Sequence, residues 1–230
     1  MNQRKTTAIV LARTVYGEAD RIVTVLTPDV GKLSLMAKGV RRVKSKLAGG
    51  IELFSVSEIT YIPGRGSVST LVSSRLIKHY GHIVADIDRT MLGYDLIKLL
   101  HKCTEDEPEA AYFELLDAAF SALDDQSVSV GIIRLWFSAQ LLRLAGHTPN
   151  LQTSTVGDKL SADERYEFDY DAMSFCLRED GVFGASQIKF LRLIFSPNVP
   201  ASLARVSGVD ELVSLLSPLV QTVRSLHLRA

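Results

Sequence analysis

Basic side chains gather in one short segment near the N-terminus of this 230-residue chain. Residues 32–46, KLSLMAKGVRRVKSK, contain six basic residues and no acidic one. The six are Lys32, Lys38, Arg41, Arg42, Lys44 and Lys46. Closely spaced cations neutralise successive phosphates, which gives affinity for a polyanion without sequence preference. The segment therefore predicts contact with a nucleic-acid backbone, and a solvated hairpin with an incidental basic patch is the alternative.

The distribution of charge along the chain supports this prediction. The whole chain carries 26 basic and 26 acidic residues, so its formal net charge is zero. Residues 1–80 contain thirteen Lys or Arg and five Asp or Glu, a balance of +8, which leaves −8 for residues 81–230. Such an asymmetry indicates a basic first domain that faces a polyanion and an acidic remainder that meets other partners.

Other reactive side chains form no catalytic motif. The sequence has no P-loop, GxSxG, HExxH or glycine-rich dinucleotide fingerprint, so we expect a protein that is not an enzyme. Glu18 and Asp20 precede Arg21. For these two acids we favour a structural role, in which a carboxylate caps backbone donors or pairs with the arginine, over acid–base catalysis. His79 and His82 have a metal-like spacing but lack ligand partners, so they are interpreted as partly exposed boundary histidines.

Aromatic residues that could stack on bases are sparse in the basic half. The candidates are Tyr16, Phe54, Tyr61 and Tyr80, and a place in a barrel core is the alternative for each.

Composition indicates a folded soluble protein, with 47% apolar and 23% charged residues. The two cysteines, Cys103 and Cys176, are far apart and predict neither a disulfide framework nor a cysteine-rich zinc site. No run of about 18 apolar residues occurs, and residues 8–12 are too few for a signal-peptide core. We therefore expect a cytoplasmic protein without a membrane span.

Periodicity divides the chain near residue 80. Strand-like alternation marks residues 7–13, 21–27, 32–38, 51–62 and 67–77. Five short strands predict a small closed barrel over residues 1–80, with an OB-fold favoured and an SH3-like barrel as the competitor. In the third strand Leu33, Leu35 and Ala37 are expected on the buried face.

Helical spacing dominates residues 81–230. Helices are predicted over residues 83–103, 108–123, 128–145, 185–195 and 209–228, separated by an irregular insert at 147–184 with a hairpin near 166–177. Pro108 suits a first helical turn, and Pro218 is expected to interrupt the last helix. The first helix is expected to bury a stripe of Ile87, Met91, Tyr94, Ile97 and Leu99 or Leu100. The last is expected to bury a stripe of Leu212, Leu215, Leu216, Leu219, Val223 and Leu226. The fold class is thus α+β, a barrel followed by a helical domain.

Several of these segments resemble the RecO family of recombination mediators. The N-terminal match consists of YGEADRIV at residues 16–23, LT at 26–27, GKL at 31–33, AKGVRR at 37–42 and Ser45. A second match runs from Phe137 through Leu141, Leu142 and Gly146 to Pro149, with His147 where an aromatic residue is usual.

The resemblance implies a function. It implies a DNA repair factor, not an enzyme, that binds single- and double-stranded DNA, anneals complementary strands and helps load recombinase onto DNA coated by single-strand-binding protein. Its implied partners are RecR and the acidic, apolar C-terminal tail of that coating protein. We assign DNA contacts to Arg21, Lys32, Lys38, Arg41, Arg42, Lys44, Lys46 and Arg65. A sequence-tolerant RNA-binding or ribosome-associated OB protein and a pure scaffold are the alternatives.

Two further expectations concern the helical half. Many family members carry a four-cysteine zinc site in the insert, but here Gln152, Thr153, Ser154 and Thr155 replace the first pair and only Cys176 is available, so we expect no zinc. An acidic peptide needs an apolar groove edged by arginine. Arg134, Leu141 and Arg143 are the candidates for that groove, and burial of Leu141 in the core is the alternative.

Overall fold

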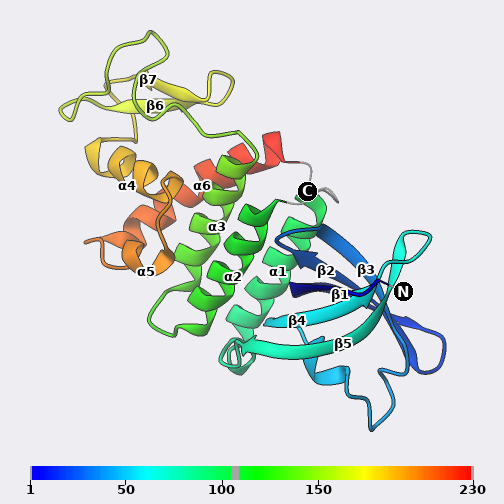
Figure 1. The fold of residues 1–230 in the computed structure, drawn as a ribbon. Helices are drawn as coiled ribbons and strands as arrows, with labels where there is room; N and C mark the ends of the chain where they lie inside the picture. The colour runs from blue at the N-terminus through cyan, green and yellow to red at the C-terminus, as the bar shows by residue number, and fades with distance from the viewer. Residues whose placement is uncertain (1, 105–108, 229–230) are drawn as a thin grey trace. The chain divides into compact units, whose positions relative to one another are not determined.

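The computed structural model describes residues 2–104 and 109–228. Its contacts divide the chain into two compact units, residues 1–126 and 127–230. The first unit contains the barrel and two helices, and the second contains the remaining helices and a small hairpin (Figure 1). The predicted role of Pro108 lies outside the described residues. Among the described residues, no helix is both long and apolar enough to span a bilayer.

The barrel contains the five predicted strands. They are β1 (Arg4–Tyr16), β2 (Asp20–Thr27), β3 (Gly31–Ala37), β4 (Ser55–Ile62) and β5 (Val68–His79). They close in the order β1-β2-β3-β5-β4, with β3 and β5 parallel and the other pairs antiparallel. The OB-like barrel and the α+β class are confirmed. The fourth strand starts later than predicted because residues 51–54 form bends before it.

Alternation along the strands gives the barrel its core. Val23, Val25, Leu35 and Ala37 are all buried, and their strand neighbours face outward. The same core includes Val40 and Ile51 from the long connection between β3 and β4. That connection is therefore anchored to the barrel at two points.

The first helix starts later than predicted, and its predicted apolar stripe is buried only in part. A 3₁₀ turn (Ile83–Ala85) precedes α1 (Ile87–Cys103), because the carboxylate of Asp86 caps the Arg89 amide at 3.0 Å. Ile87, Met91 and Tyr94, predicted to be buried, are 72%, 56% and 39% exposed. The buried face carries Ile97, Leu99 and Leu100, as predicted, together with Arg89, Leu92, Gly93 and Leu96.

An aromatic cluster explains which face is buried. A Cβ at Gly93 would lie 2.6 Å from the Phe54 ring, so the glycine admits this ring against α1. Phe54 and Tyr80 each meet Phe120 of α2 (Ala110–Asp124) edge to face, at 5.4 and 5.7 Å between ring centroids. These contacts join both helices to the barrel within the first unit.

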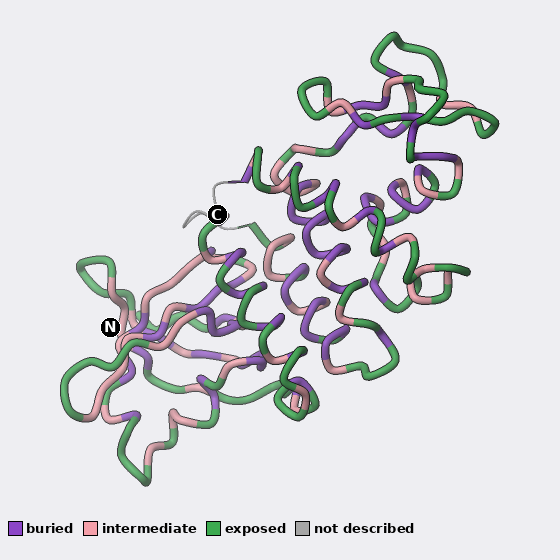
Figure 2. The backbone as a smooth tube through the Cα atoms, turned by 180° about the vertical axis from the view of Figure 1, so that it is seen from behind, coloured by how far each residue is buried: buried purple, intermediate pink, exposed green. Residues whose placement is uncertain are grey.

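The second unit is built around α3 (Val130–Leu144), which is buried on nearly every side, as predicted (Figure 2). The hairpin β6 (Tyr166–Asp169) and β7 (Ser174–Leu177) and helix α4 (Ala185–Phe195) also lie where predicted. The short α5 (Pro200–Leu203) was not predicted.

The last helix, α6 (Val209–His227), continues through Pro218, so the predicted interruption is wrong. Its predicted apolar stripe is correct only in part. Leu215 and Leu226 are 38% and 61% exposed, whereas Val213 and Val220 are buried.

Candidate nucleic-acid interface

Residues 38–46, the basic loop, are tied to the turn between β1 and β2. The Gly39 amide donates to the Asp20 carboxylate at 2.6 Å, and the Arg41 amide donates to the Ala19 carbonyl at 3.0 Å. The Arg41 guanidinium also reaches the Glu18 carbonyl at 3.0 Å. Asp20 thus caps a backbone donor, as the structural interpretation of the acidic pair expects. Gly39 has φ +66°, which favours glycine at this position.

The other end of the basic loop is also fixed. The Leu47 carbonyl accepts from the Ser74 hydroxyl at 2.9 Å, and the Leu47 amide donates to the Ser45 hydroxyl at 3.3 Å. A Cβ at Gly50 would meet Ser74 at 2.5 Å, so glycine allows the chain to approach β5 closely. The segment from Arg41 to Lys46 between these anchors is mostly exposed (Figure 2).

Five cations of the basic loop point to solvent. They are Lys38, Arg41, Arg42, Lys44 and Lys46, all exposed. Within residues 2–104 and 109–228, none of the five forms an ion pair. Cations elsewhere on the barrel differ, since Lys5 and Arg75 contact Glu58 at 2.9 and 3.2 Å. The hydrogen bond from Lys5 lowers the pKa of Glu58. In the part of the chain that the structure describes, the five cationic side chains of the basic loop are therefore not paired with carboxylates, although Asp20 bonds to the loop backbone.

The remaining predicted cations are not all beside the basic loop. Arg21 is paired with Ala37, directly before the loop. Lys32 instead donates to the His101 and Thr104 carbonyls at 3.3 and 2.5 Å, where it meets the negative end of the α1 dipole. Arg65 lies in the turn that leads into β5. The parallel register of Val68 with Ser34 places that turn toward the start of β3, whereas the basic loop follows its end.

Three predicted stacking residues are in the core. Phe54, Tyr61 and Tyr80 are 2%, 2% and 1% exposed, so their predicted contact with bases is wrong. The Tyr80 hydroxyl donates to the Asp117 carboxylate. Burial, together with this hydrogen bond, raises the pKa of Tyr80. Tyr16 is different, because it is 54% exposed at the end of β1.

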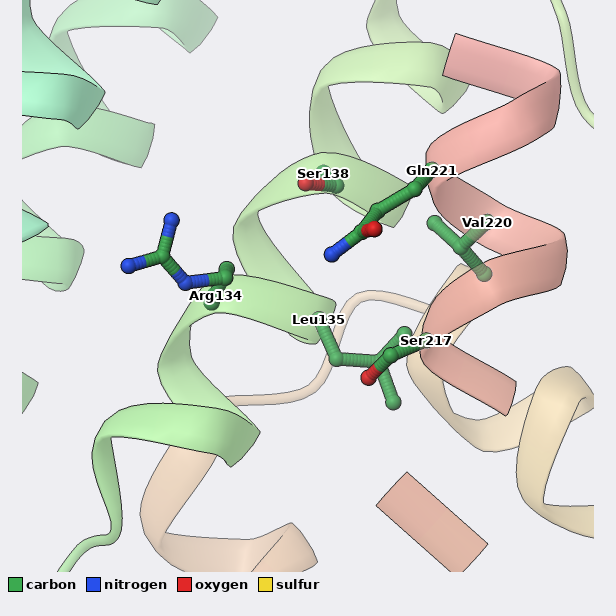
Figure 3. A pocket seen from close by; sticks show the side chains of 6 residues that line it. All are labelled: Arg134, Leu135, Ser138, Ser217, Val220 and Gln221. Carbon is green, nitrogen blue, oxygen red and sulfur yellow. The ribbon is translucent and has the colours of Figure 1, made fainter. Parts of the chain in front are cut away.

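The predicted partner-binding residues do not form one groove. Leu141 is fully buried in α3, so its predicted contact with a partner is wrong. The Arg143 guanidinium donates to the Gln140 side chain at 2.9 Å, and the Gln140 amide in turn donates to the Ile194 carbonyl at 2.6 Å. Arg134 lines a small hollow between α3 and α6, and its guanidinium points away from α6 (Figure 3). The other lining residues are Leu135, Ser138, Ser217, Val220 and Gln221.

The residues considered for a zinc site in the insert have other surroundings. Cys176 is hydrogen-bonded to the Glu167 carbonyl, and Ser154 is buried next to Phe175 through a β-bridge. A hydroxyl and one thiol do not make a closed tetrahedral set. In the described ranges, no three His, Cys, Asp or Glu side chains lie together as a metal centre.

His82, one of the two histidines at the predicted domain boundary, pairs with Asp124, with 3.3 Å between its Nδ1 and a carboxylate oxygen.

Known proteins share both halves of the chain. Family models described as Recombination protein O N terminal and Recombination protein O C terminal match residues 1–80 and 84–221. A DNA repair protein RecO of Dehalococcoides mccartyi is 33% identical over 164 residues, which are 70% of this chain and 64% of that relative. One of Rhodopirellula baltica is 35% identical over 151 residues, 65% of this chain and 56% of the relative. The chain therefore spans less than two thirds of the length of these relatives. The two family models together cover most of its residues, and the chain belongs to the RecO family.

Proposed function

We propose that this protein is a non-enzymatic mediator of DNA repair and recombination. It binds single- and double-stranded DNA through phosphates, anneals complementary strands and, with RecR, helps load recombinase onto DNA coated by single-strand-binding protein in the cytoplasm. The observation that carries the proposal is the basic loop, in which five exposed cations, none of them ion-paired within the described residues, are held between two fixed ends. Membership of the RecO family supports it.

The fixed ends matter for affinity. Ordering a flexible loop costs conformational entropy at the moment of binding, and a loop whose ends are already bonded loses less. The exposed cations then release counterions from the DNA as they replace them. If five phosphates of a single strand are neutralised, log K falls with log salt at a slope of about −3.5, taking about 0.7 per contact.

The cations of the basic loop also account for the proposed annealing. Two complementary strands repel through their phosphates, and neutralisation of part of this charge lets them meet more often. Phosphate contacts leave base edges free to pair, because they position a strand without reading it. A cationic surface of this kind therefore favours pairing between strands of any sequence.

The test is a charge reversal with a matched control. Lys38→Glu, Arg41→Glu and Arg42→Glu together should weaken binding to single-stranded DNA at least tenfold, flatten the salt slope and slow annealing. The control reverses Lys98, Lys159 and Lys189, three exposed lysines outside the barrel, and produces the same change in net charge. Equal loss in both triple variants would show that only net charge matters.

To identify the substrate, the rate of annealing is compared between RNA strands and DNA strands of the same sequence. Faster annealing of DNA supports the repair role, whereas annealing of RNA alone would assign the protein to RNA metabolism. A wild-type protein that binds no oligonucleotide at low salt would overturn the proposal.

A further inference from the structure

An apolar strip lies on the outer face of the barrel beside the basic loop. Ile22 and Met36 are cross-strand partners on β2 and β3, and both are only partly buried. Their chain neighbours Val23 and Leu35 are fully buried on the inner face, so Ile22 and Met36 point outward. Nonpolar side chains at these outward positions are not needed to fill the core.

Tyr16 extends this strip to the end of the barrel. It pairs with Asp20, and Thr14, two residues earlier on the same face, pairs with Ile22. Tyr16 is therefore on the outward face, diagonal to Ile22. Residues 1–80 contain four aromatic side chains, and the other three are buried. Tyr16 is thus the exposed ring of the described barrel.

The basic loop is fixed next to this ring. Asp20, the cross-strand partner of Tyr16, holds the Gly39 amide, and the adjacent Ala19 holds the Arg41 amide. On the other side of the strip, Lys38 follows β3 two residues after Met36. An apolar strip with an open ring is therefore bordered by exposed cations, and the hydrogen bonds keep this arrangement in place.

We propose that Tyr16, Ile22 and Met36 form a base platform, on which unpaired bases of a single strand rest while the basic loop holds its phosphates. The proposal builds on the proposed function and adds a preference for strands with open base faces. Every base offers a π-face to an aromatic ring, so the contact tolerates any sequence. Ile22 and the polarisable Met36 extend the apolar surface beyond the ring.

The preference for single strands follows from base accessibility. In a duplex each base is already stacked on its neighbours and shows only its edges in the grooves. A duplex therefore contacts the basic loop through phosphates but leaves the platform unused. A single strand uses both surfaces.

Abasic oligonucleotides separate the two contributions, because they keep the phosphates and lack the bases. Fluorescence anisotropy would compare a thymidine strand, an abasic strand of equal length and a duplex. The wild-type protein should bind the thymidine strand more tightly than the abasic one. Tyr16→Ala should weaken binding to the thymidine strand about five- to thirtyfold and remove this difference. Its binding to the abasic strand and the duplex should match that of the wild type.

Two variants serve as comparisons. Tyr16→Phe keeps the ring and should keep the difference between the two strands. Tyr170→Ala removes a partly exposed tyrosine from the insert and should bind all three probes as the wild type does. Circular dichroism verifies that each variant is folded.

The possible failures are distinct. Equal affinity of the wild type for the thymidine and abasic strands would overturn the platform and leave phosphate binding intact. Equal weakening of all three probes by Tyr16→Ala would also overturn it. No binding of the wild type to any probe would overturn the proposed function and the platform together.

Discussion

The carboxylate of Asp20 and the backbone amide of Gly39 are 19 residues apart in the chain and 2.6 Å apart in the structure. The bond joins the turn after β1 to the start of the basic loop, and the Arg41–Ala19 bond beside it closes the same junction. One acidic residue thus sets the position of several basic ones.

Loss of this bond should loosen the basic loop. In Asp20→Ala, the Gly39 amide loses its acceptor, and the free energy of unfolding should fall by about 1–2 kcal/mol. Hydrogen exchange of the amides at the start of the loop should accelerate about tenfold. Asp20→Asn removes the charge but keeps an oxygen acceptor, so it should retain most of the protection. Equal exchange in the alanine variant and the wild type would contradict this role.

The sequence was sufficient to predict the barrel because its signals are local. Alternating Val, Leu and Ala in β2 and β3 and turn residues at Pro28, Asp29 and Gly31 mark strands and connections directly. The basic loop was also identified correctly as an exposed cationic segment. The pairing of Asp20 with Gly39 was not, because it depends on the register between strands.

The buried face of α1 illustrates what local patterns cannot decide. Apolar residues occur on more than one side of this helix, so spacing alone placed the exposed Ile87, Met91 and Tyr94 in one stripe with the buried Ile97 and Leu100. The structure buries the side that carries Gly93 and Arg89. Phe54 packs on Gly93, and the Arg89 guanidinium donates to the Leu123 and Asp125 carbonyls at 2.9 and 3.0 Å. Phe54, Leu123 and Asp125 are all distant in sequence from the helix residues that they contact.

Arg134 is the predicted partner-binding residue that still borders a small hollow, between α3 and α6. If the acidic tail of single-strand-binding protein docks there, Arg134→Glu should weaken binding of a tail peptide about tenfold or more, because a charge-assisted hydrogen bond is replaced by repulsion. Isothermal titration calorimetry with the peptide measures the change. Arg178→Glu in the exposed part of the insert is the control. Unchanged affinity in Arg134→Glu would place the tail elsewhere.

Tyr80 should make stability depend on alkaline pH. Its pKa is raised above the ordinary value of 10.0, first by burial and then by Asp117. Above that ordinary value the unfolded chain ionises and the folded protein keeps its proton. The stabilisation is therefore complete below about pH 10 and is lost as the pH rises through the raised folded pKa. Urea unfolding at a series of alkaline pH values should show this decline.

Tyr80→Phe tests the assignment. At neutral pH, loss of the bond to Asp117 should cost about 1–2 kcal/mol. At alkaline pH the decline should be shallower than in the wild type, although Tyr112 and Tyr166, whose pKa values burial also raises, still contribute. Tyr170→Phe, at a partly exposed position, should reproduce the wild-type profile. A Tyr80→Phe profile as steep as that of the wild type would refute the role of Tyr80.

Aromatic packing should take the place of a metal in the insert. Phe175 is fully buried and meets Tyr166, Phe168 and Phe183 edge to face, at 6.3, 5.2 and 5.5 Å between centroids. Phe175→Ala should therefore destabilise the second unit by about 3–5 kcal/mol. Val182→Ala, at a half-exposed position in the same insert, should change stability by less than about 0.5 kcal/mol.

Chelators should not change the stability of the same insert. Zinc-dependent domains lose their folding free energy with the metal, because the ligand set exists only in the folded state. Here Cys176 is the one thiol in the insert, so a chelator should leave the thermal midpoint unchanged, and elemental analysis should find no stoichiometric zinc. One zinc per chain, or a midpoint lowered by chelation, would show that other side chains complete a site. If the aromatic cluster alone stabilises the insert, Phe175→Ala lowers the thermal midpoint and chelation does not.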